Sequence, residues 1–121
     1  MPEYSEKNRA RMVKSHEKRI LKHIEKKGIA TEKSLGDIYG IKKVRLSGNS
    51  LRDRSLKNLV KKGKVDYLLL KYKEEGKKSK DQRVFFSKDY ETTHRRVLKL
   101  VEEGVIEPKD LENILRKLER P

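Results

Sequence analysis

The sequence contains no cysteine and no tryptophan, and aromatic residues make up only 6% of it. Without cysteine, disulfides and thiolate–metal sites are excluded. No apolar run approaches the roughly 20 residues of a membrane-spanning helix, and the residues after Met1 lack the apolar region of a signal peptide. We therefore expect an intracellular location. Glutamine is nearly absent while Lys and Glu abound, which resembles the composition of proteins from thermophiles.

Catalytic and ligand-binding patterns are also missing. The histidines, His16, His23 and His94, have no carboxylate or cysteine at the spacing of metal ligands. Neither GxxxxGK[ST] nor GxGxxG occurs, and no nucleophile has a recognisable base partner. We therefore predict that the chain is not an enzyme, and that it holds no metal and no cofactor.

What the sequence has instead is positive charge. Of 121 residues, 43% are charged and only 33% are hydrophobic, and the formal net charge is +14. This composition predicts one domain with a small core, and it makes a polyanion the first partner to consider. An acidic protein or an anionic lipid surface could satisfy the same charge.

The charge is unevenly distributed along the chain. Residues 1–28 hold nine Lys or Arg against four acids, residues 41–64 hold nine against one, and residues 71–83 hold six against three. Residues 89–121 hold seven bases against eight acids. The binding surface is therefore expected in the first two thirds of the chain, and the last third has another role.

A first amphipathic helix is expected to end at Gly28. Its inner side is formed by residues at helical spacing: Ala10, Val13, Glu17, Ile20, Leu21 and Ile24. Its other side is basic and carries Arg9, Arg11, Lys18, Lys22 and Lys26. That side is either a solvated surface or an additional phosphate contact. Residues 1–14 are assigned to a basic N-terminal arm or an extension of this helix.

A short second helix is expected after Thr31, which is a suitable N-cap, and before Gly40. Leu35 and Ile38 would line its inner side. The alternating residues 41–49 then predict an extended segment that pairs with later strands.

The most informative stretch is residues 50–62. Ser50 and Asp53 form a possible capping box, and Gly63 is a suitable helix end. Apolar residues at helical spacing, Leu56, Leu59 and Val60, define its buried side. The opposite side carries Arg54, Lys57, Asn58 and Lys61, so the helix presents a cationic face with one amide.

Two strands are expected after this helix, at residues 65–72 and 83–87, separated by the polar segment 73–82. A basic helix with the pattern Leu56-x-x-Leu59-x-x-x-Gly63-x-Val65, followed by a strand, a charged loop and a strand, resembles the winged helix-turn-helix family of DNA-binding domains. The resemblance covers about residues 15–88. It implies a mainly α fold with a small antiparallel β wing, an α+β class. The long segment before Ser50 departs from the short turn of that family.

The resemblance implies binding of double-stranded DNA by a transcriptional regulator or a replication or chromatin accessory factor, located with the nucleoid in the cytoplasm. Residues 50–62 would enter the major groove. Arg54 and Asn58 are the candidates for base edges, because Arg pairs with guanine and Asn with adenine. The other DNA-binding candidates are Ser50, Arg52, Lys57, Lys61, Lys77, Lys78, Lys80 and Arg83, with the lysines and Arg83 on phosphates.

Two alternatives are kept. An RNA-binding or ribosome-associated winged-helix module is one, because Gly48-x-Ser50-Leu51-Arg52 is similar to the start of the corresponding helix in small basic ribosomal proteins. A protein-interaction winged helix whose charge provides solubility is the other.

Residues 89–121 predict two helices, one from Tyr90 to Glu103 and one starting at Pro108. The second has a narrow apolar stripe, formed by Leu111, Ile114, Leu115 and Leu118. The strand at 65–72 is apolar on both faces, so something must cover its second face. These observations predict a homodimer through residues 89–121, with capping of the sheet within one chain as the alternative.

Overall fold

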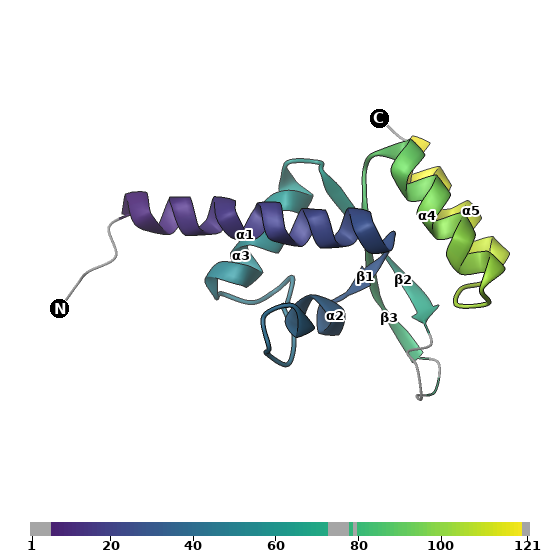
Figure 1. The fold of residues 1–121 in the computed structure, drawn as a ribbon, viewed down its shortest axis with the longest axis horizontal. Helices are drawn as coiled ribbons and strands as arrows, with labels where there is room; N and C mark the ends of the chain where they lie inside the picture. Colours follow the sequence, from purple (N-terminus) through teal and green to yellow (C-terminus); the bar gives the residue numbers. More distant parts are fainter. Residues whose placement is uncertain (1–5, 73–77, 79, 120–121) are drawn as a thin grey trace.

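The computed structural model describes residues 6–72, 78 and 80–119 (Figure 1). Five helices and a three-stranded antiparallel sheet form this part of the chain, so the expected mainly α, α+β class is confirmed. In chain order the elements are α1 (Glu6–Lys27), β1 (Ala30–Thr31), α2 (Glu32–Asp37), α3 (Leu51–Lys61), β2 (Val65–Tyr72), β3 (Lys80–Ser87), α4 (Tyr90–Glu102) and α5 (Pro108–Glu119).

The sheet has the strand order β1-β3-β2. The register of the β2–β3 hairpin runs from Val65 opposite Ser87 to Tyr72 opposite Lys80. β2 has the bounds expected from the sequence, whereas β3 begins at Lys80, three residues before the expected start. The hairpin ladder therefore extends into the polar segment. The polar side chains at this end of β3 are accommodated because this end of the strand is largely exposed.

Helices α1, α2 and α3 pack on one face of the sheet around a first buried cluster. Its largest members are Ile20, Ile24, Leu35, Leu56, Leu59 and Phe85. The expected ends of α1 and α3 are confirmed, since Gly28 and Gly63 adopt positive φ angles of 90° and 73° that other residues rarely adopt. The N-cap at Thr31 is confirmed as well, because its side chain accepts a hydrogen bond from Ser34 N.

Helices α4 and α5 cover the other face of the sheet, and Figure 1 shows these two helices as a separate layer. A second buried cluster lies between them and the strands and includes Leu70, Val84, Phe86, Val97 and Ile114. Leu111 and Leu118 of the α5 stripe pack against it. The second apolar face of β2 is thus covered within one chain, and the homodimer stays a prediction.

The expectation of an extended segment at residues 41–49 is wrong. This segment is a loop without strand structure, and the strand that pairs with β3 on the edge opposite to β2 is Ala30–Thr31 instead. The reason is that its backbone donors are bound elsewhere: Val44 N donates to Glu32 O at 3.0 Å, and Arg45 N donates to Asp53 Oδ1 at 2.7 Å. These donors are therefore not free for a sheet ladder.

Candidate nucleic-acid interface

Helix α3 begins with the capping box that the sequence predicted. Ser50 Oγ accepts from Asp53 N at 3.1 Å, and Asp53 Oδ2 accepts from Ser50 N at 3.2 Å. These bonds satisfy backbone donors at the helix start. The Ser50 hydroxyl thus already has a structural role as the N-cap of α3.

Helix α1 lies along α3, and the contact is close enough for side chain to backbone bonding. Ser55 is fully buried, and its Oγ lies 3.1 Å from Val13 O and 2.6 Å from Leu51 O, so its one proton is shared between these two carbonyls. A short side chain at this position lets the two helix backbones approach. Leu56 and Leu59 then point into the core, so the cationic side of α3 faces solvent.

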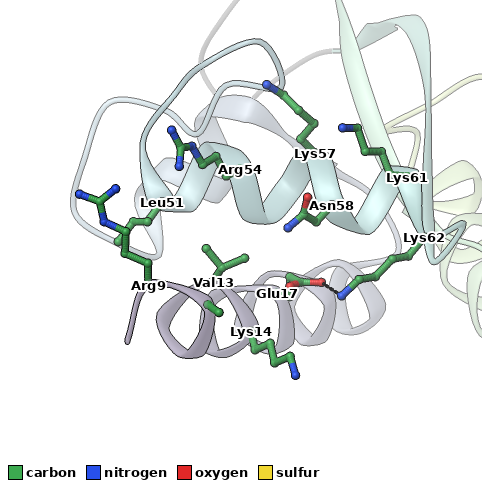
Figure 2. Close-up of a pocket in the computed structure, with 11 residues that line it drawn as sticks. Arg9, Val13, Lys14, Glu17, Leu51, Arg54, Lys57, Asn58, Lys61 and Lys62 are labelled. Carbon is green, nitrogen blue, oxygen red and sulfur yellow. Dashed lines mark hydrogen bonds and ion pairs between the residues drawn. The ribbon is translucent and has the colours of Figure 1, made fainter. Parts of the chain in front are cut away.

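A groove of about 450 Å³ separates the first half of α1 from α3 (Figure 2). Six of the residues that line it are cations, and one is an acid. The cations are Arg9 and Lys14 of α1, Arg54, Lys57 and Lys61 of α3, and Lys62 directly after α3. The acid is Glu17 of α1. Four predicted site residues, Arg54, Lys57, Asn58 and Lys61, are therefore brought to one groove.

The side chains of these four residues point in different directions. Figure 2 shows Lys57 and Lys61 extending away from α1, while the Asn58 carboxamide lies on the side of α3 that faces α1. Lys57 Nζ is 3.5 Å from Gly48 O, at the outer limit of a hydrogen bond. Asn58 has no side-chain hydrogen bond within the described part of the chain, so its donor and acceptor are both available to a ligand.

The one acid of the groove is held by a cation of the groove. Glu17 is buried, and its Oε1 accepts from Lys62 Nζ at 2.7 Å. The Lys62 side chain is 48% exposed. Because this pair neutralises the carboxylate, the remaining five cations set the sign of the potential in the groove.

Arg52 lies apart from this group, on a different side of α3. Its guanidinium carbon is 5.0 Å from the centre of the Tyr39 ring, and that of Arg19 is 4.7 Å from it. His16 Nδ1 is 3.0 Å from the Tyr39 hydroxyl. Burial, and then the charges of Arg52 and Arg19, lower the pKa of His16. This cluster joins α1, α3 and the end of α2, so the structure gives Arg52 a packing role.

The remaining predicted residues belong to the β2–β3 hairpin. Lys78 and Lys80 are exposed, and Lys77 lies outside the described residues. Arg83 is also exposed, with Nη1 3.8 Å from Glu32 Oε2 and its guanidinium carbon 5.9 Å from the centre of the Tyr67 ring. Lys78, Lys80 and Arg83 are therefore not part of the groove between α1 and α3.

Sequence reasoning missed two cations of the groove, Lys14 and Lys62. Arg9 was on the predicted basic side of the first helix, but nothing in the sequence places that helix against α3. The one available signal was Glu17, an acid at an apolar position of the α1 pattern, because a buried carboxylate requires a cationic or hydrogen-bonding partner nearby.

Comparison with known proteins provides no relative. No protein family model matches the chain, no curated protein matches it, and no solved structure matches it. Among the described residues, no group of three or more potential ligands could hold a metal ion. No helix in that part of the chain combines the length and hydropathy needed to cross a membrane.

Proposed function

We propose that this chain is a winged-helix protein of the cytoplasm that binds double-stranded DNA at the nucleoid, as a transcriptional regulator or an accessory factor. The order helix, strand, helix, helix, strand, strand, with a β1-β3-β2 sheet, is consistent with this family. The observation that carries the proposal is the groove between α1 and α3, which is lined by six cations and a single acid that is paired with one of them.

Helix α3 is the element that would enter the DNA. An α-helix with its side chains is about 10–12 Å in diameter, which matches the width of about 12 Å of the major groove of B-DNA. Arg54 and Asn58 are proposed to contact base edges, while Lys57 and Lys61 contact phosphates. Arg9 and Lys14 of α1 would then face the phosphates of one flanking strand.

We propose a DNA duplex as the ligand in preference to an RNA duplex. The major groove of A-form RNA is deep and too narrow for side chains to read, and the side of α3 away from the core is the side that carries the cations. Binding of an RNA duplex, or of an acidic protein for which polyglutamate stands in, remains an outcome of the experiment below.

The test is a salt titration of binding to a DNA duplex, an RNA duplex and polyglutamate. The wild-type chain is compared with the variant Arg54→Gln/Lys57→Gln/Lys61→Gln and with the control Arg95→Gln/Lys99→Gln/Lys109→Gln. Both variants lose three charges, but the control changes exposed residues of α4 and α5, on the far side of the sheet. We expect tightest binding to DNA, lost in the α3 variant and nearly kept in the control. Equal losses in both variants, or a preference for RNA or polyglutamate, would contradict the proposal.

A further inference from the structure

The loop at residues 41–49, between α2 and α3, presents cations that the groove does not use. Lys42, Lys43 and Arg45 are all exposed, whereas Val44 between them is fully buried. No acidic residue occurs in this loop. The buried valine anchors the middle of the loop in the core, so the three neighbouring cations are held at the surface.

Two carboxylates fix the backbone of the loop from the inside. Asp53 of α3 is buried and accepts from Arg45 N at 2.7 Å, in addition to its bond from Ser50 N. Glu32 of α2 accepts from Leu46 N through Oε2 at 2.8 Å. These two carboxylates are thus occupied by backbone amides of the loop, and its three cationic side chains stay exposed.

Two glycines allow this close packing. A Cβ on Gly36 of α2 would lie 2.5 Å from Lys43 Cα, and a Cβ on Gly48 would lie 2.0 Å from Asp53 Oδ2. Contacts this short require displacement of one partner, so any larger residue at either position would shift the loop or its carboxylate anchor. The loop therefore has one defined position against α2 and α3.

The loop lies on the side of α3 opposite to α1. Asp53 and Lys57 contact the loop, whereas Ser55 and Lys62 contact α1. Because successive helix residues are rotated by about 100°, the first pair lies roughly opposite the second around the helix axis. Arg54 and Lys61 project between these two sides, so α3 has cations of α1 on one flank and cations of the loop on the other.

We propose that Lys42, Lys43 and Arg45 form a second phosphate-binding surface, and that it contacts the DNA strand opposite to the strand contacted by α1. This inference rests on the proposed function, because it places α3 in the major groove, where the two phosphate backbones flank the helix. The long connection between α2 and α3 is then a contact element, and its fixed backbone presents the three cations with little loss of conformational freedom on binding.

The experiment combines a salt titration with phosphate-ethylation interference on a DNA duplex. For the wild-type chain we expect interfering phosphates on both strands that border one major groove. In Lys42→Gln/Lys43→Gln/Arg45→Gln, interference should disappear from one strand only. The slope of log affinity against log salt should flatten by up to about 2.7, or 0.9 for each phosphate. The control Arg95→Gln/Lys99→Gln/Lys109→Gln should keep the interference on both strands.

Gly36→Ala tests the fixed position of the loop with all charges kept. Because the added methyl group pushes on the Lys43 backbone, we expect weaker interference on the same strand and a partial flattening of the slope. Urea unfolding shows whether this variant is folded. If it is not folded, the variant Lys42→Gln/Lys43→Gln/Arg45→Gln decides whether the loop binds phosphates, because it changes exposed residues only.

The possible failures are distinguishable. If the α3 variant loses binding while the loop variant keeps the wild-type slope and interference on both strands, the second surface is overturned and the proposed function stands. If the wild-type chain does not bind DNA, or the α3 variant binds like wild type, the proposed function fails and the inference falls with it.

Discussion

The Lys62 ammonium, just after the end of α3, lies 2.7 Å from the buried Glu17 carboxylate in the middle of α1. This ion pair links α1 to the end of α3, the two helices that form the cationic groove. Its carboxylate is the one acid that lines the groove. Stability and binding therefore make opposite demands on Glu17, because the carboxylate supports the packing of α1 on α3 but opposes the approach of phosphates.

Substitution of the two partners should separate these effects. Lys62→Met leaves a buried carboxylate without its cation, so we expect the free energy of unfolding to fall by about 1–2 kcal/mol, less than for a fully buried pair because Lys62 is half exposed. Glu17→Gln should cost less, since its amide oxygen can still accept from Lys62, and it should tighten DNA binding. Urea unfolding measures the stability of each variant, and a DNA titration measures its affinity. Lys61→Met is the matched control for stability. Equal losses of stability for the two variants, or no gain in affinity for Glu17→Gln, would contradict this account.

Base discrimination should depend on two side chains of α3. Arg54→Ala and Asn58→Ala are each expected to reduce the difference in binding free energy between a preferred and a random duplex by roughly 1–3 kcal/mol. Lys61→Ala should weaken binding to every duplex by a similar factor, because a phosphate contact carries no sequence information. A selected duplex pool supplies the preferred site. Uniform losses for all three variants would restrict Arg54 and Asn58 to positioning roles.

Stability should fall on mild acidification because of two histidines of α1. Burial lowers the pKa of His16, assisted by Arg52 and Arg19, and burial lowers the pKa of His23, assisted by Lys27 and Lys26. The folded state then binds fewer protons than the unfolded state, so this contribution is present above the ordinary pKa of 6.5 and is lost as the pH falls below it. We expect a lower free energy of unfolding at about pH 5.5 than at about pH 7.5. The double variant His16→Asn/His23→Asn should show a smaller difference between these conditions; an unchanged difference would assign the acid sensitivity to other groups.

The elements of the fold were predictable where local signals agreed. The capping box of Ser50 and Asp53, the positive φ at Gly63 and the bounds of β2 all follow from residues close in sequence. The loop at 41–49 was not predictable, because its alternating pattern is also that of a strand, and the carboxylates that bind its backbone belong to α2 and α3. The cationic side of α3 could likewise be predicted from periodicity. That Lys14 of α1 lines the same groove could not, because this depends on the close approach of α1 to α3 at Ser55.

The last prediction concerns the homodimer through residues 89–121. Within the chain, Ile114 is fully buried and Leu111 and Leu118 pack on the sheet, so a dimer has to use the surface that α4 and α5 leave exposed. Two large hydrophobic side chains of α4 are exposed in the described part of the chain, Tyr90 at 40% and Leu98 at 39%, and Leu98 is the aliphatic one. We expect sedimentation at micromolar concentration to give about twice the chain mass of 14.3 kDa, and Leu98→Lys to give a monomer.

The control for this prediction is Met12→Lys, which changes an exposed apolar residue of α1 outside the C-terminal helices. It should leave the dimer intact. A chain shortened to end at Ser87 is unsuitable for the comparison, because loss of α4 and α5 uncovers Val84 and Phe86 and destabilises the sheet itself. A monomeric full-length chain would rule out the dimer, and it would leave the sheet-covering role as the function of α4 and α5.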